Sequence, residues 1–283
     1  MKHIAWIAAG GIGVGIIASA LAGVVDQERH VFPFLGNAAC RDADGPETEK
    51  HFVWNDDDSI EIHVPGTVRY RGGEGGDVIV RGPQKLVDAI RIHGDRIESA
   101  CNHFFYWKGS SDRDLVVTLP GRSFRRVGVA GSADLTMENV QQPELALAIS
   151  GSGSVRAAGQ GGRVTTSISG SGKADFSQLT MNQLDVQVSG SGRVDGATGN
   201  SERVKISVSG SGKVRVGELK TKQLDVHVSG SGRVEASPED QADISISGSG
   251  TVTLLSQPTR LNSSVSGSGR IVQSTNKRAE RGV

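Results

Sequence analysis

The tetrapeptide Ser-Gly-Ser-Gly occurs seven times between Ser150 and Gly269. Its steps are 19, 20, 20, 20, 18 and 19 residues, with copies that begin at Ser150, Ser169, Ser189, Ser209, Ser229, Ser247 and Ser266. A fixed period in this range is typical of repeat proteins, in which one unit cannot bury its apolar face alone and neighbouring units must stack. The sequence therefore predicts a stack of similar units.

Apolar and polar residues alternate through each repeat, as residues 183–195 show. One set of alternate positions holds Leu184, Val186, Val188, Gly190, Gly192 and Val194. This period of two predicts a half-buried strand. The apolar residues keep the same alternate positions before and after the glycines, so we expect the chain to bend there without reversing its direction. We expect both glycines to face inward, where the absence of a Cβ leaves room for the bend.

The repeat length fits one coil of a solenoid. At roughly 3.3 Å per residue a repeat is long enough for one coil, and equivalent strands of successive coils would lie parallel at about 4.8 Å. The alternative is a run of antiparallel hairpins, with Gly-Ser-Gly as each turn, that closes into a barrel or sandwich. Near-identical units favour stacking in register. The predicted fold class is therefore all-β, a parallel β-helix (β-solenoid) with one repeat per coil.

The N-terminal residues 1–25 form a predicted export signal. Residues 4–25 are uncharged and mostly apolar, and Lys2 and His3 precede them. Their length suits a transmembrane helix that stays attached as an anchor, whereas Ala20-Leu21-Ala22 suits cleavage as a signal peptide. If the segment is uncleaved, the membrane is a partner of the chain.

The rest of the chain divides into three predicted parts: a linker over residues 26–50, a β-solenoid domain over residues 51–273 and a polar tail over residues 274–283. Within the domain, the segment 129–135 resembles a worn copy of the repeat, because it lies about one period before Ser150. A short helical turn is expected near residues 84–89.

Composition limits the function classes. The chain has 31 Lys and Arg against 31 Asp and Glu, and this neutral balance gives no electrostatic case for a nucleic-acid partner. It has 39 Gly but only 3 Trp, 2 Tyr and 7 Phe, which favours a thin aliphatic core. The 7 His show no metal-ligand spacing, so neither a metal nor a cofactor is predicted.

Stacking in register would align equal positions of successive repeats into rows. The fourth residue after the first Ser of each motif is in turn Ser154, Lys173, Arg193, Lys213, Arg233, Thr251 and Arg270. Four consecutive cations at about 4.8 Å would repel by roughly 0.9 kcal/mol per neighbouring pair even in water. Either nearby Asp175, Asp195 and Glu235 offset this repulsion on a solvated face, or a bound polyanion such as an acidic glycan does. The candidate ligand-binding residues are therefore Lys173, Arg193, Lys213 and Arg233.

Two other rows are interpreted as structural. Asp185, Lys205 and Asp225 would alternate in sign along the stack, which favours correct register. The motif serines are expected to form hydrogen-bonded ladders on the surface. They lie in no Gly-x-Ser-x-Gly elbow, and Gly-Ser-Gly does not open a helix as a phosphate-binding loop must.

Cys40 and Cys101 are the only cysteines. Export would place them in an oxidising compartment, so they are a candidate disulfide, and the alternative is two independent thiols. Beside Cys101 lies an aromatic run, residues 103–107, in a chain otherwise poor in aromatics. This run is expected to cover an open end of the solenoid, and the alternative is stacking on sugar rings.

Paired segments such as SIEIHVPGTV (residues 59–68) and DLVVTLPG (residues 114–121) precede the serial Ser-Gly-Ser-Gly coils. With the N-terminal export segment, this order resembles the putative auto-transporter adhesin, head GIN domain family, over roughly residues 51–273. The resemblance implies a right-handed parallel β-helix and an exported bacterial envelope protein, and it brings no catalytic residues.

The predicted function is that of an exported, non-enzymatic β-solenoid that serves as an adhesion, scaffold or ligand-binding module. It would be periplasmic or at the cell surface, anchored in the cytoplasmic membrane by its N-terminal segment, with an acidic glycan or another envelope component as partner. The alternative is a carbohydrate-active enzyme, a polysaccharide lyase or glycosidase on a β-helix. Such enzymes need converging carboxylates, but the only acidic run here is Asp56-Asp57-Asp58, and no catalytic residue is predicted.

Overall fold

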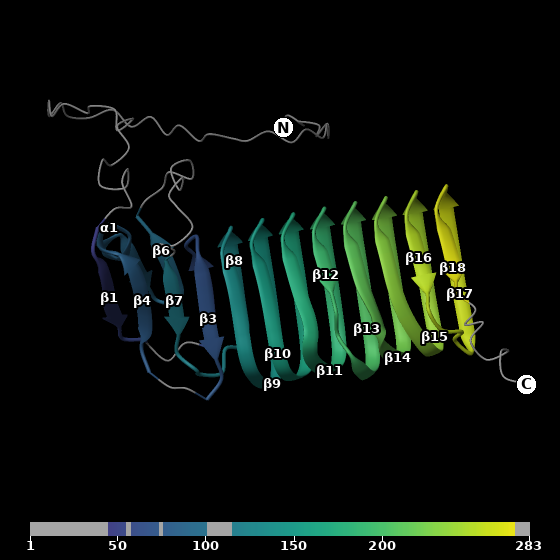
Figure 1. The fold of residues 1–283 in the computed structure, drawn as a ribbon. Coiled ribbons are helices and arrows are strands. Elements are labelled where there is room, and N and C mark those ends of the chain that lie inside the picture. The colour runs from purple at the N-terminus through teal and green to yellow at the C-terminus, as the bar shows by residue number, and fades with distance from the viewer. Residues whose placement is uncertain (1–44, 55–57, 74–75, 101–114, 275–283) are drawn as a thin grey trace, which may run out of the picture. The chain divides into compact units, whose positions relative to one another are not determined.

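The computed structural model describes residues 45–54, 58–73, 76–100 and 115–274, which belong to one compact unit, Gly36–Val283. Most of them lie in strands of a single sheet (Figure 1). The strands before the regular stack are β1 (Glu47–Phe52), β2 (Ser59–His63), β3 (Thr67–Arg71), β4 (Val78–Pro83), β5 (Ile90–His93), β6 (Arg96–Ser99), β7 (Val116–Leu119) and β8 (Arg126–Gly131). The stack continues with β9 (Asp134–Gly151), β10 (Ser154–Gly170), β11 (Lys173–Gly190), β12 (Arg193–Asp195), β13 (Gly199–Gly210), β14 (Lys213–Gly230), β15 (Arg233–Gly248), β16 (Thr251–Leu254), β17 (Arg260–Gly267) and β18 (Arg270–Gln273). The helix α1 covers Gln84–Asp88, where a helical turn was expected.

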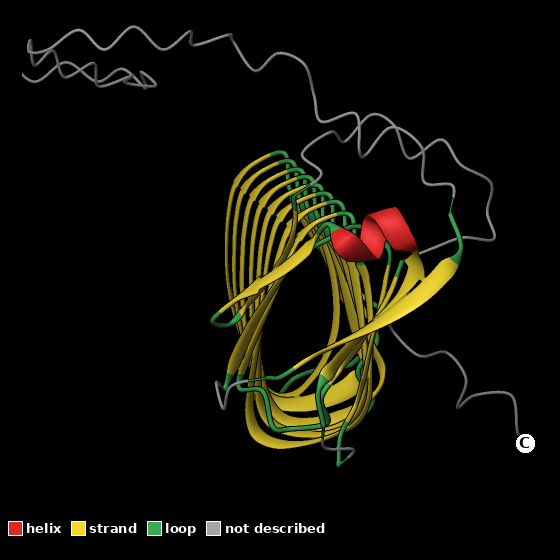
Figure 2. Cartoon of the chain, turned by 90° about the vertical axis from the view of Figure 1, so that its left-hand side faces the viewer, coloured by secondary structure: helices red, strands yellow, loops and turns green. Residues whose placement is uncertain are grey.

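Successive repeats are coils of a parallel β-solenoid. The strand β10, for example, begins directly after one Ser-Gly-Ser-Gly motif, ends inside the next and pairs in parallel with β9 and β11. Ser169 therefore lies opposite Ser150 on one side and Ser189 on the other. Viewed along the stack, the corners of successive coils overlie one another (Figure 2). The predicted parallel stacking is confirmed, and the hairpin alternative is wrong.

The two glycines of each motif have different functions at the corner. Gly190 has a φ of 115°, and a Cβ there would lie 2.6 Å from the carbonyl oxygen of Gly170 in the preceding coil. Gly192 is buried, and a Cβ there would lie 2.6 Å from Cγ2 of Ile168. Only the second glycine faces inward, so the prediction for the first was wrong: it supplies a left-handed backbone and a close approach between coils.

The core is thin and aliphatic, as the composition predicted. Inward positions of neighbouring coils hold fully buried side chains in continuous rows, for example Val188, Val208 and Val228. The outward positions between them are polar and exposed or half-buried. Alternation of this kind along a stacked strand buries one face and leaves the other free for charged side chains.

The first coils do not follow the order of the sequence. The coil made of β2 and β3 lies between β6 and β7 on one side and β8 and β9 on the other. The worn copy near Ser132 stacks on the first clear motif, with Gly131 opposite Gly151, as predicted. Residues 59–71, which precede 96–119 in the chain, are thus the second layer of the stack.

Antiparallel strands and α1 complete the N-terminal end. Strand β4 pairs antiparallel with β7 and with β1, and β5 pairs antiparallel with β6. Beneath them Phe124 is fully buried, with its ring centroid 5.9 Å from that of Trp54 and 5.8 Å from that of Tyr70. This small aromatic cluster widens an otherwise aliphatic core.

The C-terminal end has no such cover among the described residues. Strand β17 pairs only with β15, and β18 pairs only with β16. Leu261 and Val265 continue inward rows of the core, but they are 37% and 44% exposed. The last coil therefore shows apolar side chains and an unpaired strand edge.

Several predictions concern residues that the structure does not describe. These are the export segment 1–25, most of the linker 26–50, the tail after Ser274, Cys40, Cys101 and the aromatic run 103–107. Strand β1 begins at Glu47, before the predicted start of the solenoid domain. Within the described ranges, no helix is long and apolar enough to cross a membrane.

Candidate functional site

The four candidate cations form one row along the solenoid. Lys173 of β11 lies opposite Arg193 of β12, which lies opposite Lys213 of β14, which in turn lies opposite Arg233 of β15. We call these four residues the cation row. Their neighbours in sequence, such as Ala174 and Val194, are buried, so the cations occupy the outward positions of their strands. Stacking thus places four positive charges on successive rungs.

Carboxylates beside the cation row pair mainly with other cations. Asp195 Oδ1 accepts a hydrogen bond of 2.7 Å from Arg215 Nε, and its Oδ2 lies 3.7 Å from Lys173 Nζ. Asp175 Oδ2 lies 3.6 Å from Nε of Arg156, which is outside the row. In the part of the chain that the structure describes, no ion pair within 4 Å involves Arg193, Lys213 or Arg233. Local ion pairs therefore offset the charge of Lys173 but leave three of its row neighbours available.

Asp175 and Asp195 are the carboxylates that stacking brings together beside the row, since they face each other on adjacent rungs. Burial, the largest single influence, raises the pKa of Asp175. Hydrogen bonds from the side chain and backbone of Ser177, with Lys173 and Arg156 nearby, outweigh burial and hold that pKa below its ordinary value. A general acid of a glycosidase needs a raised pKa instead. This pair is suited to ion pairing.

The motif serines flank the corner in two exposed rows, but their hydroxyls do not form the predicted ladders. Within the described ranges, no side-chain hydrogen bond joins one motif serine to another. Rungs lie about 4.8 Å apart, whereas two hydroxyl oxygens must approach to about 2.8 Å. Register alone therefore does not bring neighbouring motif hydroxyls within hydrogen-bond distance, and these exposed hydroxyls face solvent.

Longer side chains do bridge the rungs on another row. Arg163 Nε donates to Gln183 Oε1 at 3.0 Å, and Arg203 donates to Gln223 Oε1 at 2.8 Å. The row of Asp185, Lys205 and Asp225 is also in register, as its interpretation requires.

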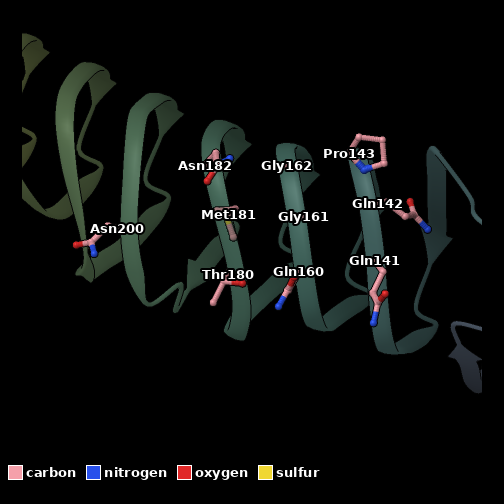
Figure 3. Close-up of a pocket in the computed structure, with 10 residues that line it drawn as sticks. All are labelled: Gln141, Gln142, Pro143, Gln160, Gly161, Gly162, Thr180, Met181, Asn182 and Asn200. Atoms are coloured by element: carbon pink, nitrogen blue, oxygen red, sulfur yellow. The ribbon is translucent and has the colours of Figure 1, made fainter.

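One feature that sequence reasoning missed is a hollow of about 390 Å³. Gly161 and Gly162 line it, together with Gln141 and Pro143 from one neighbouring coil and Asn182 from the other (Figure 3). Gly161 lies opposite Gln142 and Met181, so one coil lacks the side chains that its neighbours carry. The sequence signal for this hollow is the segment 158–162, where the alternation of apolar and polar residues is interrupted.

Other candidates give no site in the described residues. No group of three or more His, Cys, Asp or Glu could hold a metal ion there. Asp58, the described member of the acidic run, lies 3.6 Å from Arg125 and 3.7 Å from Arg126. It is thus part of surface ion pairs.

Comparison with known proteins agrees with this architecture. The model of the family described as "Putative auto-transporter adhesin, head GIN domain" matches residues 108–197 and 195–258, together more than half of the chain. The chain belongs to this family. No curated protein resembles it closely enough to count as a match. The family resemblance expected from the serial motifs is therefore confirmed.

Solved structures share the fold at low sequence identity. A putative adhesin from Parabacteroides merdae has a TM-score of 0.71 and 17% identity, and the alignment covers 82% of this chain and 97% of that one. A putative adhesin from Parabacteroides distasonis has a TM-score of 0.71 and 19% identity, with 82% and 98% covered. A putative lipid binding protein from the same organism has a TM-score of 0.70 and 18% identity, again with 82% and 98% covered. At these identities the likeness shows the β-solenoid fold.

Proposed function

We propose that this head GIN family member is an exported cell-envelope module for adhesion or scaffolding, without enzymatic activity, and that the cation row binds linear polyanions such as acidic glycans. Its N-terminal segment, residues 4–25, would anchor it in the cytoplasmic membrane. The observation that carries the proposal is the register of four cations on successive rungs, three of them without an ion pair among the described residues. Family membership supports export and a surface role.

A polyanion that lies along the solenoid axis would meet one positive charge per rung. Binding would relieve the repulsion of about 0.9 kcal/mol between neighbouring cations. The exposed serine hydroxyls next to the row could then donate hydrogen bonds to the same chain. Charge-assisted contacts of this kind weaken with salt, because exposed charges are screened within about 10 Å at moderate ionic strength.

The test is retention on heparin and on a polyuronate matrix. Changing Lys173, Arg193, Lys213 and Arg233 together to Ala should lower retention strongly, and the remaining retention should depend less on salt. The control changes Arg163, Arg203, Lys205 and Lys222 to Ala, which removes the same charge from other rows. Equal losses in both variants would mean that retention follows net charge and not the row, and unchanged retention in the first variant would refute the proposed site.

The enzymatic alternative predicts a different result. The same matrices, incubated with the protein, should release no sugars if the module only binds. Turnover that one carboxylate substitution abolishes would replace the proposal by an enzymatic one.

A further inference from the structure

The exposed apolar side chains of the described residues gather at one end of the solenoid. Of the five large hydrophobic residues that are exposed, four lie beyond residue 254: Leu255, Leu261, Val265 and Val272. Leu261 and Val265 occupy rows whose previous members, Ala242 and Ile246, are 0% and 1% exposed. These two residues would be core if one more layer lay on the last coil.

The backbone of the same coil also lacks partners on one side among the described residues. Within that part of the chain, β17 and β18 pair on their inner side alone, so their outer N–H and C=O groups form an open edge. Every one of the eight residues of β17 is exposed. An open, largely uncharged edge next to apolar side chains is a template for pairing with another strand. Arg260 is the only charged residue of β17, and Arg270 is the only one of β18.

The opposite end is not a suitable partner for this edge. Its outer strand β1 carries Glu47, Glu49, Lys50 and His51, and charged side chains on an edge strand discourage further pairing. Head-to-tail stacking into a filament is therefore disfavoured. The chain's own tail is a poor cover too, since among residues 275–283 only Ala279 and Val283 are apolar.

We propose that the C-terminal coil is the contact surface of an end-to-end dimer with a second copy of this chain. A two-fold axis perpendicular to the solenoid axis brings the two last coils together and reverses the chain direction across the contact. The outer edge of each last coil would then pair antiparallel with its partner and bury Leu261, Val265 and Ile271 against the same residues of the second copy. A two-fold contact closes on itself, which stops growth at the dimer. This inference is independent of the proposed polyanion site.

Sedimentation equilibrium of the full chain in density-matched detergent, combined with hydrogen exchange of β17, tests the proposal. The wild-type chain should have the mass of a dimer and slow exchange in β17. Val265→Lys places a charge at the contact and should give a monomer with fast exchange in β17, because Lys at a 44% exposed position is tolerated by the isolated coil. Val53→Lys, at an apolar position that is 77% exposed elsewhere, is the matched control and should remain dimeric.

Three outcomes would overturn the proposal. A dimer that persists in Val265→Lys would lie elsewhere, for example in the N-terminal segment. A wild-type monomer whose β17 amides are protected would mean that the chain's own tail covers the end. A wild-type monomer with fast exchange in β17 at every accessible concentration would mean that the edge stays open.

Discussion

At its N-terminal end the solenoid is closed by β1, β4, β5 and α1, whereas at its C-terminal end β17 and β18 have no neighbour on their outer side within the described residues. The same kind of coil lies beneath both ends. The closed end adds antiparallel strands, an aromatic cluster around Phe124 and a charged edge strand. At the open end, the last described strands, β17 and β18, repeat the coil without such additions.

The comparison shows what the repeat can and cannot supply. A repeat specifies its contact with the next repeat, and it specifies that contact equally for the last one. A stop signal must therefore come from residues that depart from the repeat. The first 131 residues contain such departures, but the last coil keeps the motif up to Gly269. The two ends should accordingly differ in stability and in association.

The largest difference is expected for core truncations at the two ends. Phe124→Ala removes a 0% exposed ring that contacts Trp54 and Tyr70, and it should lower the free energy of unfolding by about 3–5 kcal/mol. Val265→Ala at the open end should cost about 0.5 kcal/mol. Urea unfolding at low protein concentration measures both. Similar costs for the two variants would show that the last coil is covered in solution.

A second difference is expected between an inner corner and the last corner. Gly210 and Gly267 have φ values of 114° and 109°, and a Cβ at either would lie 2.6 Å from a carbonyl oxygen of the preceding coil. Ala at Gly210 should destabilise the whole stack by about 1–3 kcal/mol from backbone strain alone, and the contact adds to it. In the monomer, at low protein concentration, Ala at Gly267 should only loosen β17 and β18, because no strand of the described residues pairs with their outer edge.

Urea unfolding and hydrogen exchange separate these two effects. Gly76→Ala is the control for strain without a contact, since Gly76 has a φ of 132° and no atom within 4 Å of a Cβ. Equal global destabilisation by Gly210→Ala and Gly267→Ala at a protein concentration that keeps the chain monomeric would contradict the idea that the last coil of the monomer is held on one side only.

The sequence predicted the regular coils well because each repeat carries its own register signal. The period alone places Lys173, Arg193, Lys213 and Arg233 on successive rungs. The first coils carry no repeated motif, so the sequence did not indicate the order in which they stack. Nothing in the segments around Ile62, Ile97 and Val129 says that the first belongs between the other two, because their pairing depends on packing between distant parts of the chain.

Two predictions about the corner of the coil were wrong: the serine ladders and the inward position of the first motif glycine. Serine ladders were expected from register alone, but no described motif serine donates its hydroxyl to the next one, whereas an Arg and Gln pair such as Arg203 and Gln223 does bridge two rungs. The first motif glycine was assigned to the core because its parity matches Val188. Its positive φ interrupts the alternation of inward and outward positions. Counting every second residue along the sequence does not detect a residue with left-handed backbone.

The smallest expected difference between the ends concerns acid. Hydrogen bonds from Arg96 lower the pKa of Glu61 below its ordinary 4.5 and connect β6 to β2 at the closed end. Hydrogen bonds from Asn262 and then Gln241 lower the pKa of Asp243 below its ordinary 3.8, and the former connects β17 to β15 at the open end. A carboxyl group with a lowered pKa in the folded state contributes stability above its unfolded pKa and loses it as the pH falls through the folded value.

Acidification should therefore loosen β6 below pH 4.5 and β17 below pH 3.8. Both effects should be small, because both carboxylates are exposed to solvent and screened. The closed end should nevertheless change less, since antiparallel β5 and the buried Ile97 also hold β6, whereas in the monomer β17 pairs with β15 alone among the described residues. Hydrogen exchange between neutral pH and about 3 measures this difference, with Glu61→Gln and Asp243→Asn as variants that should flatten the response of their own end only. If Asp243→Asn left the acid response of β17 unchanged, the bridge between Asp243 and Asn262 would not be what retains the last coil.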